Sequence, residues 1–166
     1  MTTFIPDKLL PPEQAVPFFE DSQKMDIPGR GTKKSVKVLQ GEIVGALGRL
    51  GAGVSLIVPG TVSAGEHTRC GFQIQFVYGG LPGRIDCVAL PIRNESPRAK
   101  DRALAQALYL LRDELLAMAL SAMHKPGAVP LLPYLIGSGG KTVTEALVES
   151  QQIPQMPQPM LLSSGG

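Results

Sequence analysis

Basic residues cluster where a long amphipathic helix is expected to begin. Ser96-Pro97 has the chemistry of a helix start, because the serine hydroxyl can accept a free backbone amide and proline fits the first helical position. Cations at this end oppose the helix dipole and lower stability unless an anion compensates. The cluster consists of Arg93, Arg98, Lys100 and Arg102. It predicts a phosphate-binding site, and the alternative is ordinary solvated charge that Asp101 partly neutralises.

Two further sets of cations extend this prediction. A strand register that pairs Tyr78 with Arg84 places Arg69 directly across from Arg93, which is an unfavourable pairing of like charges. A second basic patch lies earlier in the chain. The candidate nucleic-acid-binding residues are therefore Arg69, Arg93, Arg98, Lys100 and Arg102, with Lys33, Lys34 and Lys37 as the second patch. Because the net charge is only +2, binding would depend on this local clustering.

The residues that could ligate a metal or act in catalysis form no recognisable arrangement. In the register given above, Cys70 and Cys87 point to opposite faces of the sheet, so they can share neither a zinc ion nor a disulfide. The two histidines, His67 and His124, lie in no triad or nucleophile motif. We therefore expect no catalytic residue, no metal and no cofactor, and a small enzyme with an unrecognised site is kept as an alternative.

A glycine-rich loop, Gly137-Ser-Gly-Gly-Lys-Thr142, resembles the end of a phosphate-binding loop. The full pattern needs a glycine five residues before Gly140, and the chain has Leu135 there. We therefore interpret this segment as a loop that leads into a short helix.

Hydrophobic periodicity predicts the elements that would position these residues. Helices are expected at about 35–50 and 96–125, and the second has a wide apolar stripe in which Leu108 and Leu111 should be core residues. Strands are expected at 54–58, 69–78 and 84–92, followed by a short helix at 142–149. The predicted fold is α+β, with a helix, a three-stranded antiparallel sheet, a long helix packed on the sheet and a small C-terminal helical appendix.

The composition divides the chain into a body and two terminal segments. We predict an irregular, proline-rich arm at 1–34, a single α+β domain at 35–150 and a disordered tail at 151–166. The apolar residues of the tail, among them Met156 and Met160, could bind a protein partner. No apolar run reaches the roughly 18 residues that span a bilayer. The two cysteines and the lack of a cleavable signal peptide predict a cytoplasmic protein without membrane contact.

Residues 35–148 resemble a loosely defined group of small uncharacterised proteins from prophages and plasmids. The motifs that carry the resemblance are Leu50-Gly-Ala-Gly, Phe72-Gln-Ile-Gln-Phe, Leu90-Pro-Ile, Leu104-Ala-Gln-Ala-Leu-Tyr-Leu-Leu-Arg, Leu132-Pro-Tyr-Leu-Ile and Gly139-Gly-Lys-Thr-Val-Thr-Glu-Ala-Leu. A three-stranded sheet crossed by a long helix is also similar to the core of phage single-strand annealing proteins. The resemblance implies an accessory protein of a mobile element that binds nucleic acid, with single-stranded DNA favoured, and assembles into homo-oligomers.

The same order of elements is shared with double-stranded RNA-binding domains, in which a basic start of the second helix grips phosphates. That resemblance implies phosphate contacts for Arg98, Lys100 and Arg102, with His67 as the loop histidine. The chain departs from the pattern because no Gly-Pro precedes His67 and the long helix exceeds the usual length. A third interpretation is a protein-interaction adaptor that uses the proline- and methionine-rich terminal segments.

Overall fold

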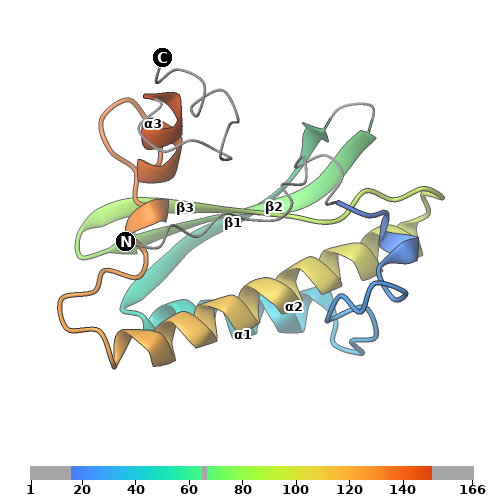
Figure 1. Cartoon of the computed structure of the whole chain (residues 1–166), viewed down its shortest axis with the longest axis horizontal. Helices are drawn as coiled ribbons and strands as arrows, with labels where there is room; N and C mark the ends of the chain where they lie inside the picture. Colours follow the sequence, from blue (N-terminus) through green and yellow to red (C-terminus); the bar gives the residue numbers. More distant parts are fainter. Residues whose placement is uncertain (1–15, 65–66, 151–166) are drawn as a thin grey trace, which may run out of the picture.

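The computed structural model describes residues 16–64 and 67–150 and has two layers (Figure 1). The helices α1 (Val36–Arg49) and α2 (Pro97–Ala122) lie on one face of the sheet, and the short helix α3 (Val143–Glu149) lies on the other side. The antiparallel sheet has the order β1-β2-β3, formed by Ala52–Ala64, His67–Tyr78 and Leu81–Val88. The predicted α+β class and the predicted order of elements are confirmed.

The register of the β2–β3 hairpin differs from the prediction. Tyr78 pairs with Leu81 instead of Arg84, so the predicted register is wrong by three residues. The turn consists only of Gly79 and Gly80, both with positive φ, which is the conformation of a tight two-residue hairpin turn. Because an odd shift exchanges the faces of a strand, the opposite set of β3 side chains faces the helices.

The corrected register gives the sheet one apolar face under the helices. Ile74 pairs with Ile85, and both are buried against the helices. Leu108 is fully buried and Leu111 is 7% exposed, which confirms their predicted places in the core. The other buried helix residues of this core are Leu39, Ile43, Ala46 and Leu47 from α1 and Ala105 and Leu115 from α2.

The start of α2 has the predicted capping residues. The Ser96 hydroxyl accepts a hydrogen bond from the amide of Ala99 at 3.0 Å, and Pro97 occupies the first helical position. The helix continues for 26 residues beneath the sheet. Its start, the far end of the β1–β2 hairpin and the segment before α1 lie together at one end of the molecule (Figure 1).

The described part of the N-terminal arm, residues 16–34, contacts the body. It contains the 3₁₀ turn η2 (Phe19–Asp21), and Phe19 is buried against Cys70 and Ala103. Ser22 is fully buried, and its hydroxyl oxygen lies 3.3 Å from the side-chain nitrogen of Gln106 in α2. The rest of the arm, residues 1–15, and the predicted tail at 151–166 lie outside the described residues.

The C-terminal part of the described chain returns to the free edge of β3. The 3₁₀ turn η3 (Leu132–Tyr134) is followed by Leu135, which forms an isolated antiparallel bridge with Gly83. Within residues 16–64 and 67–150, no helix combines the length and the apolar character needed to cross a bilayer.

Candidate nucleic-acid-binding site

Three of the predicted cations lie on the first two turns of α2. Arg98 and Lys100 are exposed, and Arg102 is half-buried. None of the three forms an ion pair with another described residue, and Asp101 forms none either. The first turn also lacks an acidic residue. The positive end of the helix dipole therefore meets positive side chains, an arrangement that an anion would stabilise.

Arg93 has a different environment, because the arm supplies its partners. Its guanidinium lies 2.6 Å from the Asp21 carboxylate and 4.6 Å from the centre of the Phe18 ring. The backbone amides of Arg93 and Asn94 donate to the Glu20 carboxylate at 3.0–3.1 Å. Burial alone raises the pKa of Glu20, but these amide hydrogen bonds outweigh it and lower that pKa below its usual value. Arg93 therefore helps to hold the arm.

Arg69 is half-buried, and its side chain is hydrogen-bonded to the backbone. Its Nε donates to the carbonyl oxygen of Ala89 at 2.7 Å, and burial lowers the pKa of its guanidinium. The β2–β3 ladder ends where Gly71 pairs with Val88, so Arg93 lies beyond it. The prediction that Arg69 and Arg93 are directly paired across strands is wrong.

The second basic patch lies at the start of α1. Lys34 forms an ion pair with Glu42, which also accepts a hydrogen bond from Arg112 of α2 at 2.8 Å. Hydrogen bonds from Lys34 and then Arg112 lower the pKa of Glu42. Lys33 and Lys37 are exposed, and neither is ion-paired in the part of the chain that the structure describes. Glu42 therefore joins Lys34 to Arg112 of α2, whereas Lys33 and Lys37 remain available to a ligand.

A hollow of about 600 Å³ lies beside the cations of α2. Its floor is apolar, and its rim carries three hydroxyl groups, one carboxylate and one ammonium group. The lining residues are Cys70, Leu90, Ile92 and Pro97 for the apolar part and Thr61, Thr68, Ser96, Glu95 and Lys100 for the polar part. We call it the α2 hollow. Sequence reasoning missed it because its walls come from separate segments, and only the helix start carried a recognisable signal.

The two thiols lie on the same face of the sheet. Cys87 pairs with Phe72, and Cys70 is two residues before Phe72 on β2, so the prediction of opposite faces is wrong. Both are buried free cysteines. Burial raises the pKa of Cys87 to about 12 and also raises that of Cys70, so both remain protonated at neutral pH. Among the described residues, no group of three or more His, Cys, Asp or Glu side chains has a metal-site arrangement.

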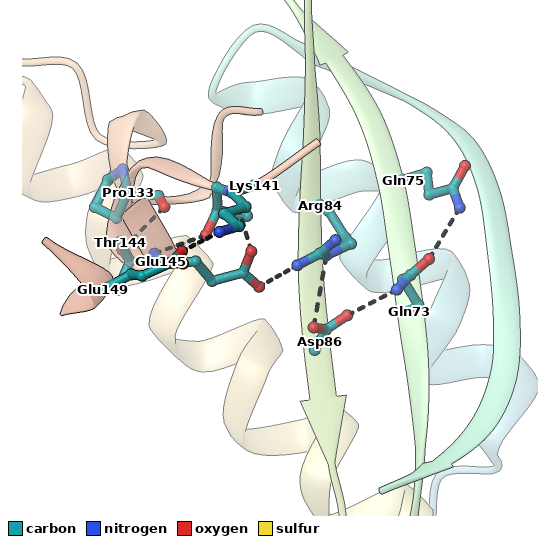
Figure 2. A network of polar contacts seen from close by, with 10 residues as sticks. Gln73, Gln75, Arg84, Asp86, Pro133, Lys141, Thr144, Glu145 and Glu149 are labelled. Atoms are coloured by element: carbon teal, nitrogen blue, oxygen red, sulfur yellow. Dashed lines mark hydrogen bonds and ion pairs between the residues drawn. The ribbon is translucent and has the colours of Figure 1, made fainter. Parts of the chain in front are cut away.

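The cations near α3 have partners. Figure 2 shows Arg84 of β3 between Glu145 of α3, with which it forms an ion pair, and Asp86, at 3.6 Å. Lys141 forms an ion pair with Glu149. Thr142 caps α3, because its hydroxyl accepts a hydrogen bond from the Glu145 amide at 3.2 Å. Lys141 and Thr142 of the glycine-rich loop therefore help to hold α3.

No protein-family model matches the chain, and no similar protein was found among curated proteins or solved structures. The resemblances to prophage and plasmid proteins, to annealing proteins and to double-stranded RNA-binding domains therefore stay predictions.

Proposed function

We propose that this protein binds nucleic acid and contacts its phosphate backbone with the start of α2. One observation carries the proposal. Arg98, Lys100 and Arg102 project from the first two turns of the helix and have no carboxylate partner within the described ranges. Phosphate oxygens would neutralise these cations and accept hydrogen bonds from them, and the helix dipole favours an anion at the same place.

Single-stranded DNA is the ligand that we propose first. Its bases are accessible, and the apolar α2 hollow adjoins the proposed phosphate contacts. The aromatic residues Phe72 and Phe76 face the helices, so they do not offer a stacking platform on the open face of the sheet. Affinity would therefore come mainly from phosphate contacts and would depend strongly on salt. A role as an accessory protein of a mobile element follows from the resemblance of residues 35–148 to prophage and plasmid proteins. Strand annealing follows from the fold-level similarity to phage single-strand annealing proteins. Assembly into homo-oligomers completes this proposal.

Double-stranded RNA is the second candidate. The observation in its favour is the placement of both helices on one face of a three-stranded antiparallel sheet, with cations at the start of the second helix. Recognition of a duplex would use backbone and shape and would need no stacking surface. His67 begins β2 at the end of the long hairpin, and its ring lies 4.9 Å from that of Phe18.

The double variant Arg98→Gln/Arg102→Gln tests the phosphate contacts. Fluorescence anisotropy with labelled single-stranded DNA, duplex DNA and duplex RNA, over a range of salt concentrations, gives the affinity and its salt dependence. We expect at least about tenfold weaker binding to every sequence, and a salt slope that is flatter by about one to two units. Tighter binding of the parent protein to single-stranded DNA than to both duplexes would support the first ligand.

A charge-matched control is Arg49→Gln/Lys125→Gln. Both residues are exposed. Arg49 is the last residue of α1, and Lys125 follows the C-terminal end of α2, far along that helix from Arg98 and Arg102. This control should bind as the parent does. The proposal is wrong if the parent binds no nucleic acid at low salt, or if the Arg98/Arg102 variant binds as tightly as the parent. An equal loss in the control would mean that net charge, and not the α2 start, drives binding.

A further inference from the structure

We propose that the α2 hollow binds one unpaired nucleobase, with guanine preferred, while Lys100 contacts the adjoining phosphate. This inference rests on the proposed function and specifies how one nucleotide of the strand is held. The volume of about 600 Å³ lies in the range of about 300–1,000 Å³ that is common for small-ligand sites. A base is flat and largely apolar on its faces, which suits the wall formed by Cys70, Leu90 and Ile92.

The charged groups of the hollow indicate the chemistry of the ligand. Glu95 and Lys100 both line it, but they do not pair with each other or with any other residue in the described ranges. A ligand that satisfies both needs hydrogen-bond donors on one part and negative charge on another. A nucleotide has this combination, because the edge of its base can donate hydrogen bonds and its phosphate is anionic.

Guanine fits the carboxylate of Glu95 better than the other bases do. Its ring N–H and its neighbouring amino group are parallel donors, which match the two oxygens of one carboxylate in a bidentate arrangement. Adenine and cytosine present an amino group without a neighbouring N–H donor, and thymine presents a single ring N–H between two carbonyl groups. The hydroxyl groups of Thr61 and Thr68 can donate to or accept from the remaining edge of the base.

The inference also places the base next to the proposed phosphate contacts. Lys100 is two residues from both Arg98 and Arg102 on α2 and lies on roughly the opposite side of the helix, so a strand held by those two residues reaches the hollow by crossing the helix start. Such a strand can insert one base without leaving the helix start. Binding would therefore combine a contact that is independent of sequence with one that is selective for a base.

Two oligonucleotides separate the inference from the proposed function. One contains only thymine, and the other contains a single guanine among thymines. The parent protein should bind the guanine-containing strand about tenfold more tightly, because one bidentate base contact gives discrimination of this order. Glu95→Gln should bind both strands with the affinity of the parent for the all-thymine strand and with an unchanged salt slope, because the phosphate contacts remain.

A second variant fills the hollow without changing its charge. Thr68→Trp introduces a large side chain at an exposed position of the rim and should also remove the preference for guanine. Its control is Val62→Trp on the neighbouring strand, where Val62 pairs with Arg69 and does not line the hollow. The control should keep the preference. Thermal unfolding of each variant establishes that it is folded.

The outcomes are distinguishable. Equal, salt-dependent binding of both strands by the parent leaves the phosphate proposal intact and overturns the inference, as does a guanine preference that survives in Glu95→Gln. If the parent binds neither strand at low salt, the phosphate proposal fails and the inference fails with it.

Discussion

The first two turns of α2 and the surroundings of α3 both carry clustered cations, but within residues 16–64 and 67–150 only those around α3 have ionic partners. Around α3, Arg84 binds Glu145 and Lys141 binds Glu149. At the start of α2, Arg98, Lys100 and Arg102 have no ionic partner in the described ranges. This difference in ion pairing follows from how much apolar surface each helix buries. α3 has no fully buried residue and depends on polar contacts, whereas α2 buries an apolar stripe that tolerates unfavourable charge at its start.

The comparison shows that the sequence position of a cation does not reveal its role. Arg93 and Arg98 are five residues apart in the chain. The first is bound to Asp21 and stacks on Phe18, whereas the second is exposed without an ionic partner in the described part of the chain. Arg93 precedes the helix and contacts a distant segment, and a local charge pattern does not record that contact.

The largest expected effect comes from removing the apolar support of α2. Leu108→Ala should destabilise the protein by about 2–5 kcal/mol, because it leaves a cavity beneath a fully buried side chain. Urea unfolding measures the change. Leu120→Ala on the same helix is the control, since Leu120 is 64% exposed and its loss should change stability by less than about 0.5 kcal/mol. A loss below about 1 kcal/mol for Leu108→Ala would show that burial does not explain the tolerance of α2 for charge.

A smaller effect separates the paired cations from the unpaired ones. Arg84→Gln should destabilise the protein by about 1 kcal/mol, because its side chain is only 21% exposed and the substitution removes the ion pair with Glu145. Arg98→Gln should cause no loss of stability, because it relieves an unfavourable interaction with the helix dipole. Both are measured by urea unfolding. A loss in Arg98→Gln as large as that in Arg84→Gln would remove the distinction between the two regions.

The smallest expected effect is a local loosening of α3 in acid. A hydrogen bond from the Thr142 amide, followed by one from Arg84, lowers the pKa of Glu145 below its ordinary value of 4.5. A carboxylate with a lowered pKa stabilises the fold above the unfolded value, and this contribution is lost as the pH falls through the folded value. Hydrogen exchange at the Ala146 amide, which donates to the Thr142 carbonyl at 2.9 Å, should therefore lose protection below about pH 4.5.

Glu145→Gln supplies the control for this prediction. It removes the titrating group, so protection at Ala146 should be lower at neutral pH and should not fall further in the same acid range. An acid-induced loss that persists in this variant would assign the effect to another carboxylate.

The order of elements was predictable because it depends on local signals. The apolar stripe of α2, its Ser96-Pro97 start and the core positions Leu108 and Leu111 are encoded within one segment. The register of the β2–β3 hairpin was not predictable, because Gly79, Gly80 and Gly83 permit turns of more than one length. The apolar residues of the third strand also match β2 in either register, so alternation alone could not select the correct one.

The candidate site was predictable only in part, for a related reason. The cations of α2 are contiguous in sequence, and their conflict with the helix dipole is a local property. The partners of Arg93 lie about 70 residues away in the arm, and the α2 hollow is assembled from four separate segments. Contacts of this kind depend on the tertiary arrangement and leave no pattern in the sequence.

The docking of the arm has a consequence for synthesis of the chain. Ser22 contacts Gln106, which lies 84 residues later, and Phe19 is buried against residues from β2 onward. At a translation rate of about 5–20 residues per second, Ser22 is made roughly 4–17 s before its partner Gln106. During this interval the burial site of Phe19 is incomplete. Asp21 has already been made when its partner Arg93 is synthesised. Residues 16–34 are therefore made before the sheet and α2 but reach their native contacts only after both have been made.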